Sequence, residues 1–197
     1  MNKIVTHSGT VFDLVNPSQE MVVVDDIALS LSRQARFAGH TQEVYTVAQH
    51  CVVLSHLFFE HPLMALLHDA AEAYITDIPT PVKELIPEIH TIEARILRVV
   101  YAALGISDYA AGVFEDSLHT CDRWLGVAEG HLLMPDAARE AMFDGSEPRR
   151  VAQALTAQRG RLEPWHQYQA YCEFLQRFYE LSTVQGQREA IVVEEVI

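Results

Sequence analysis

Residues 65–83, ALLHDAAEAYITDIPTPVK, carry a histidine and three acids within an otherwise apolar segment. On one helix, His68, Asp69 and Glu72 would all point to the same side. Burying an imidazole and two carboxylates is unfavourable unless a partner compensates, and a divalent cation binds both kinds of group. Asp77 follows the predicted helix end, where we expect the DIPTP turn to direct its carboxylate toward the same cavity.

Two further candidate ligands lie on other predicted helices. A metal site usually has three or four protein donors, so one helix does not complete it. The segment VYTVAQHCVV offers His50 upstream, and LHTCDRWLGVAE offers Asp122 downstream. An HD dipeptide alone arises easily by chance, whereas a histidine, a His-Asp pair and an aspartate in this order are far more specific.

This ordered set resembles the HD-domain metal-dependent phosphohydrolases, whose defining pattern is H...HD...D. The chain is most similar to the 5′-deoxynucleotidase branch and to related small bacteriophage enzymes, including dATP triphosphohydrolases. The matching segments between about residues 28 and 180 are RFAGHT, VAQH, HDAAEAYITDIPTPVK, the aspartate of CDRW, and PWHQYQAYCEFLQRF. The long match HDxxExxxxDxPxPxK is specific to the branch.

The resemblance implies a role for each matched position. The implied ligands of one divalent ion, which would be Co²⁺, Mn²⁺, Zn²⁺ or Mg²⁺, are His50, His68, Asp69 and Asp122. The acids that would handle protons are Glu72 and Asp77. The substrate contacts would be Arg36 to phosphate, Phe37 near the sugar and Lys83 to phosphate. A single ion is expected, because the dinuclear relatives have a lysine at the position of Glu72.

Physical chemistry supports these roles independently. A guanidinium suits planar phosphate recognition, and a carboxylate beside an activated water orients it or accepts its proton. Ordinary structural roles compete with them: His50 as a satisfied core histidine, Asp122 as an exposed acid and Asp77 as a cap of the next turn. Arg33, three residues before Arg36, is an alternative phosphate ligand.

The remaining pattern predicts one HD-type domain over residues 1–197, all-α with a small N-terminal β-hairpin in residues 1–24. Apolar spacing and Gly or Pro breaks predict a helical core over 25–182, with a tail at 183–197 that is either a strand or irregular. The predicted helices cover 25–36, 43–59, 62–75, 88–104, 107–134 and 163–182.

Bulk composition excludes several classes of protein. The net charge of −13 argues against non-specific binding to nucleic-acid backbones, which needs a stripe of basic side chains. No apolar run is long enough to cross a bilayer, and the N-terminus does not read as a secretory signal. Three widely spaced cysteines indicate reduced thiols and a cytoplasmic protein. The amphipathic final helix favours a homo-oligomer.

We therefore expect an enzyme in which an activated water attacks the 5′-phosphorus of a deoxynucleotide. Cleavage of a monophosphate and release of triphosphate from a dNTP need the same ligands, so both stay open. The alternative is a non-catalytic HD-type nucleotide sensor or adaptor. The intact ligand set, with Glu72 beside it, favours the enzyme.

Overall fold

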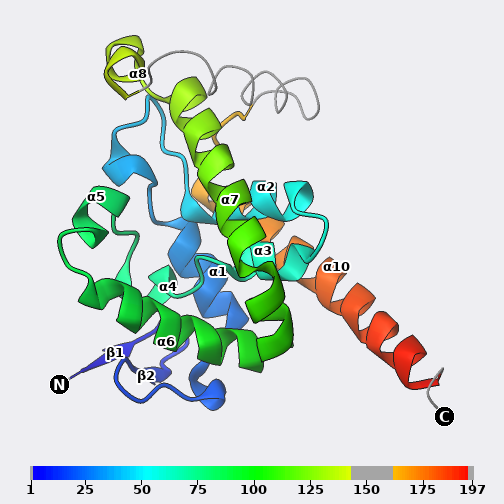
Figure 1. Cartoon of the computed structure of the whole chain (residues 1–197). Helices are drawn as coiled ribbons and strands as arrows, with labels where there is room; N and C mark the ends of the chain where they lie inside the picture. Colours follow the sequence, from blue (N-terminus) through cyan, green and yellow to red (C-terminus); the bar gives the residue numbers. More distant parts are fainter. Residues whose placement is uncertain (1, 143–161, 195–197) are drawn as a thin grey trace.

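A short β-hairpin opens the chain and helices dominate the rest (Figure 1). This computed structural model describes residues 2–142 and 162–194. β1 (Lys3–Val5) pairs antiparallel with β2 (Val11–Asp13), and Gly9 has a φ of 87° in the connecting turn. Glycine adopts that angle without strain. The predicted fold class, all-α with a small N-terminal hairpin, is confirmed.

A buried acid ties this hairpin to the helices. Asp26 lies in α1 (Val24–Ser32) and is 6% exposed. Its carboxylate accepts hydrogen bonds from the backbone N–H of Ser8 at 2.8 Å and from the hydroxyls of Thr6 and Ser8, both at 2.6 Å. These bonds replace the water that the buried carboxylate loses.

The core lies between four helices. α2 (Val47–Leu57) packs against α3 (Pro62–Leu67) and α10 (Gln167–Glu194), and α10 also packs against α1. The fully buried side chains of the core include Leu31, Leu54, Leu66 and Phe174. This packing holds α2 and α3, which carry the two candidate histidines, against each other.

The single helix predicted over 62–75 is wrong. α3 ends at Leu67, a turn follows, and α4 (Glu72–Ile75) begins a new helical segment. Within the turn the bonds run three residues back instead of four, as in Glu72 N–H to the carbonyl of Asp69 at 2.9 Å. This tightened turn contains the candidate ligands His68 and Asp69.

Two long helices follow the expected pattern. The segments predicted at 88–104 and 107–134 are confirmed as α6 (Glu88–Ala103) and α7 (Asp108–Leu133). Gly105, with a φ of 87°, separates them. Figure 1 shows α7 running along the side of the bundle and α10 extending away from the body toward the C-terminus.

Other boundaries differ from the expected ones. The short elements that the sequence did not predict are η1 (Gln19–Met21), η2 (Phe37–Gly39), α5 (Thr80–Lys83) and α8 (Asp136–Met142). α1 ends before residue 36 and α2 begins after residue 43, so the chain between them is free to line a pocket. α10 continues to Glu194, which places a helix where a strand or irregular tail was predicted; residues 195–197 lie outside the described part.

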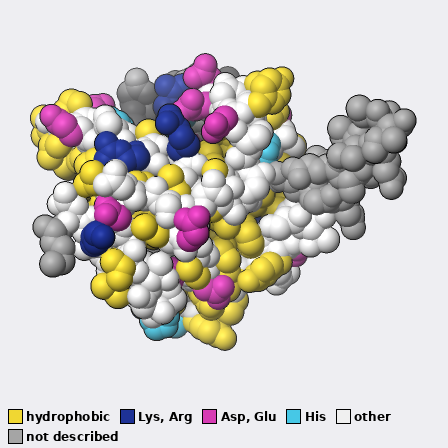
Figure 2. Space-filling view, turned by 90° about the horizontal axis from the view of Figure 1, so that it is seen from below, with side chains coloured by type: hydrophobic (Ala, Val, Ile, Leu, Met, Phe, Trp, Pro, Cys, Tyr) yellow, Lys and Arg dark blue, Asp and Glu magenta, His cyan; other side chains and the backbone are white. Residues whose placement is uncertain are grey.

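The surface is mixed in character. On the face seen in Figure 2, basic side chains lie among acidic and apolar ones. Among the described helices, none combines the length and apolar character that a bilayer crossing requires. The cysteines are free thiols, from the buried Cys51 to the exposed Cys172.

Candidate metal site

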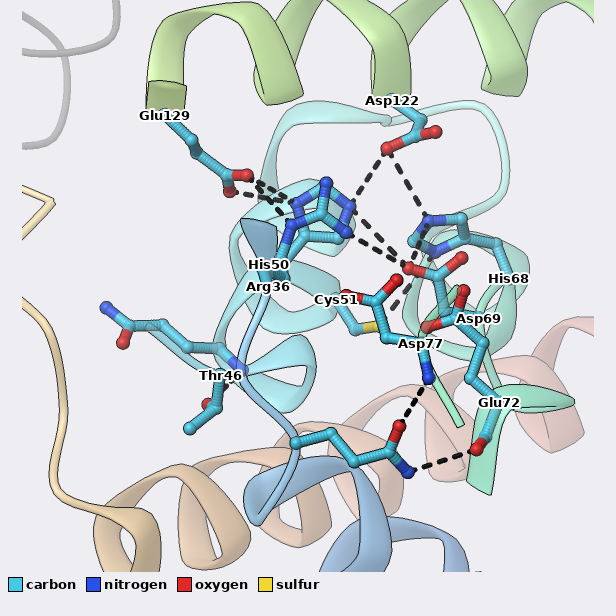
Figure 3. Close-up of polar contacts among 12 residues, drawn as sticks. Arg36, Thr46, His50, Cys51, His68, Asp69, Glu72, Asp77, Asp122 and Glu129 are labelled. Carbon is cyan, nitrogen blue, oxygen red and sulfur yellow. Dashed lines mark hydrogen bonds and ion pairs between the residues drawn. The ribbon is translucent and has the colours of Figure 1, made fainter. Parts of the chain in front are cut away.

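His50 is a fully buried histidine in the middle of α2. Its Nδ1 lies 2.8 and 3.0 Å from the two carboxylate oxygens of Glu129 on α7. Its Nε2 faces the other way, 2.9 Å from Oδ1 of Asp122 and 3.9 Å from Oδ2 of Asp69 (Figure 3). Nδ1 of His50 thus faces the carboxylate of Glu129, and Nε2 points at the candidate ligands Asp69 and Asp122.

His68 repeats this arrangement from the end of α3. Its Nδ1 donates to the backbone carbonyl of Ala65 at 2.8 Å. A carbonyl only accepts, so Nδ1 carries the hydrogen. Its Nε2 lies 3.1 Å from Oδ2 of Asp69 and 3.7 Å from Oδ1 of Asp122.

Three of the four candidate ligands form one compact group. Ligand atoms of His50, His68 and Asp69 all lie within 4.8 Å of one another, a group that could hold a metal ion. Both Nε2 atoms are buried and lack a hydrogen bond of good geometry, although carboxylate oxygens lie close by. Nitrogen lone pairs and carboxylate oxygens facing one small space fit a divalent cation.

Electrostatics keeps the two aspartates anionic. Burial by itself raises the pKa of Asp69, but the interactions with His68 and the charge of His50 together outweigh burial and lower that pKa to about 2. At Asp122 burial again opposes ionisation, and the close contacts with His50 and His68 hold its pKa well below the usual range. Anionic oxygens are the form in which carboxylates bind a cation.

Glu129 also contacts this site, although it was not among the residues predicted from the sequence. It is fully buried on α7, where its Oε1 accepts from the hydroxyl of Tyr45 at 2.7 Å in addition to facing His50. Its other oxygen lies 3.2 Å from Nε of Arg36. Glu129 follows Asp122 by seven residues, about two helical turns, so helical spacing offered a signal that both face the same side.

The structure brings Arg36, and not Arg33, to the site. Arg33 caps α1 and is exposed, whereas Nη1 of Arg36 lies 3.4 Å from Oδ2 of Asp69. The backbone N–H of Arg36 donates to the carbonyl of Tyr45 at 2.9 Å, which secures the loop that carries it. The guanidinium carbon also lies 5.8 Å from the ring centre of Phe37.

Glu72 lies beside the ligands and faces Lys83. It is 5% exposed, and its Oε1 lies 3.2 Å from Nζ of Lys83. Burial, together with the charges of Asp69 and Asp77, raises the pKa of Glu72 well above its ordinary value. Nζ of Lys83 also lies 2.6 Å from Oε1 of Glu93, so two carboxylates bind the ammonium that was predicted to contact phosphate.

Asp77 reaches the site through an unusual backbone. Thr76 before it has φ 75° and ψ 157°, a combination that essentially only glycine adopts without strain. The side chain of Gln34 holds both flanks: its oxygen accepts from the N–H of Asp77 at 2.7 Å, and its nitrogen donates to the carbonyl of Glu72 at 3.0 Å. Burial raises the pKa of Asp77.

A pocket of about 570 Å³ opens onto this group. Its acidic wall consists of Asp69, Glu72, Asp77 and Asp122. Its other lining residues are Arg36, Phe37, Ala38, His40, Ile78, Pro79, Thr80, Pro81, Lys83 and Met134. A volume of this size, lined by both apolar side chains and a few polar groups, suits a small organic ligand.

Comparison with known proteins finds similar chains but no family. No protein-family model matches the sequence. The chain is 43% identical over 107 residues to the uncharacterized protein YfdR of Escherichia coli, covering 54% of this chain and 60% of YfdR. It is 34% identical over 110 residues to an uncharacterized protein of Rhodobacter capsulatus, covering 50% of this chain and 56% of the relative. The chain therefore spans a little over half the length of these relatives, whose names carry no activity.

Proposed function

We propose that the protein is an HD-type, metal-dependent phosphohydrolase that removes the 5′-phosphate or triphosphate group from a deoxynucleotide. The proposal rests on the convergence of His50, His68 and Asp69 within 4.8 Å, beside a pocket that Asp69 lines. Asp122, 2.9 Å from Nε2 of His50, supplies a fourth donor. A divalent ion held there would lower the pKa of a water to about 7 in favourable cases and offset phosphate charge.

The acids of the pocket suit the proton transfers of hydrolysis. Glu72 and Asp77 both line the pocket, and neither is among the four ligands. Their raised pKa values, caused first by burial, let a carboxylate accept a proton from the attacking water and release it later. Arg36 would bind the phosphate from beside Asp69, and Phe37 would contact the sugar.

The charge of the pocket favours a monophosphate over a triphosphate. Among the described lining residues, the side chains with a permanent positive charge are Arg36 and Lys83. Arg36 faces Glu129 and Asp69, and Lys83 binds Glu72 and Glu93, so these acids already compensate both charges. The β- and γ-phosphates of a dNTP would add negative charge opposite an acidic wall.

Nucleotide hydrolysis with added metal tests the proposal. Protein stripped of metal would be supplied with Co²⁺, Mn²⁺, Zn²⁺ or Mg²⁺, and release of phosphate or triphosphate from each dNMP and dNTP measured. We expect phosphate release from a dNMP, and at least a 10³-fold loss in Asp69→Ala, roughly what loss of a catalytic centre costs. Asp116→Ala, at an exposed acid on α7, is the matched control and should retain activity.

The outcomes separate the competing functions. Triphosphate release would reverse the preference for a monophosphate. Tight metal binding with no hydrolysis of any nucleotide would favour the HD-type sensor or adaptor. Equal activity in Asp69→Ala and the parent would show that the site assignment is wrong. A cytoplasmic location and homo-oligomeric assembly remain predictions.

A further inference from the structure

Glu129 is a buried carboxylate that none of the roles above uses. Its side chain is 0% exposed, and an ionised carboxylate in such a place is costly unless several donors surround it. Tyr45 and His50 contact it through hydrogen bonds, and Arg36 through an ion pair at 3.2 Å. The last two of these side chains are a candidate metal ligand and the candidate phosphate ligand.

The contact with His50 selects one form of its ring. Both carboxylate oxygens of Glu129 lie within 3.0 Å of Nδ1. An ionised carboxylate only accepts hydrogen bonds, so in the neutral imidazole Nδ1 carries the hydrogen and Nε2 keeps its lone pair. That lone pair faces Asp69 and Asp122, where the ion would lie. The carbonyl of Ala65 likewise accepts from Nδ1 of His68, so Nε2 of His68 also keeps its lone pair.

The contact with Arg36 extends the same carboxylate toward the pocket. Nε of Arg36 lies 3.2 Å from Oε2 of Glu129, and Nη1 lies 3.4 Å from Oδ2 of Asp69. The guanidinium is therefore held between the buried acid and a candidate ligand. Glu129 thus contacts both Arg36, which lines the pocket, and the buried side chain of His50.

We propose that Glu129 is a positioning residue that orients His50 for metal binding and holds Arg36 beside the ion. This inference rests on the metal site of the proposed function. Carboxylates that accept from the far nitrogen of a ligating histidine fix its tautomer, and their loss typically weakens metal binding about 10- to 100-fold. The competing role is structural: Glu129 would only neutralise Arg36 within the core.

Co²⁺ binding to three variants separates the two roles. Glu129→Gln keeps the shape but offers one acceptor oxygen, and Glu129→Asp keeps the charge but withdraws the carboxylate from His50. Tyr45→Phe is the matched control, because it removes a hydrogen bond to Glu129 that touches no ligand. For each, the Co²⁺ dissociation constant by calorimetry, the visible spectrum of bound Co²⁺ and the melting temperature without metal would be measured.

We expect both Glu129 variants to bind Co²⁺ about 10- to 100-fold more weakly, with an altered spectrum. Tyr45→Phe should melt at a lower temperature and bind Co²⁺ as the parent does. If Glu129→Gln does not fold, the Co²⁺ affinity of Glu129→Asp distinguishes the two roles, because its carboxylate still balances the charge of Arg36.

The inference is overturned if the Glu129 variants lose only melting temperature while the Co²⁺ affinity and spectrum match those of the parent. It is also overturned, together with the metal site, if the parent binds no Co²⁺. A parent that binds Co²⁺ without hydrolysing any nucleotide would contradict the proposed activity alone, because the comparison of affinities would still decide the role of Glu129.

Discussion

Replacing Thr76 by glycine is expected to stabilise the folded protein, because the backbone at this position suits glycine and not threonine. Thr76 has φ 75° and ψ 157°, between the end of α4 and Asp77. A residue with a Cβ in such a region costs about 1–3 kcal/mol. The side chain of Thr76 is exposed, so its removal sacrifices little packing.

The size of the gain follows from two opposing contributions. Relief of the backbone strain contributes about 1–3 kcal/mol. The greater freedom of glycine in the unfolded chain takes back about 0.5–1 kcal/mol. We therefore expect Thr76→Gly to raise the free energy of unfolding by about 0.5–2 kcal/mol. Thr76→Ala keeps a Cβ and hence most of the strain, so it should lie within about 0.5 kcal/mol of the parent.

Urea unfolding at 25 °C of the parent and both variants measures this difference. Hydrolysis should survive in Thr76→Gly, because the bonds from Gln34 to Asp77 and Glu72 still hold the segment. The expected stabilisation is contradicted if Thr76→Gly unfolds at the same urea concentration as Thr76→Ala, or at a lower one. Such a result would mean that the backbone at Thr76 is not strained in solution.

Two further predictions concern stability. Ala38, at φ 51° and ψ 29°, lies in the left-handed region, which asparagine adopts more readily than alanine. Ala38→Asn should therefore raise the free energy of unfolding by about 0.5–1 kcal/mol. Urea unfolding checks this, and a loss of stability would contradict it. Burial opposes ionisation of Asp26, but the hydrogen bonds from Ser8 and Thr6 outweigh it and lower its pKa. A lowered pKa stabilises the fold above the unfolded value of about 3.9, and this contribution is lost as the pH falls through the folded value. Asp26→Asn should therefore melt at a lower temperature than the parent at pH 7, and this difference in melting temperature should be smaller at pH 3. An equal difference at both pH values would argue against the lowered pKa.

The elements that were predicted correctly are those with local signals. Gly9 in the hairpin turn and Gly105 between α6 and α7 end their elements through their own backbone freedom, which a single residue type reveals. The helix predicted over 62–75 was wrong because apolar residues continue through the turn after Leu67. The amide of Gln34 bonds to backbone groups of Glu72 and Asp77, and a contact 38 residues away leaves no periodic trace.

In the candidate site, too, some features were predicted from local signals and others were not. His50, His68 and Asp69 were identified from residue types and order, and their atoms meet within 4.8 Å. The contacts of Lys83 were not identified from the sequence. A lysine after a proline turn is equally consistent with a phosphate ligand and with a partner of Glu72 and Glu93. Only the positions of α4, α5 and α6 relative to one another distinguish these possibilities.

The fold class and the candidate metal ligands could be predicted from the linear chain, because apolar periodicity, turn residues and ligand types are all read from it directly. The packing of the helices is what brings Glu129 to Nδ1 of His50 and Arg36, instead of Arg33, to Asp69. These contacts join α7, α2 and the loop after α1. They depend on how helices pack and rotate against one another, which the spacing within any one helix does not specify.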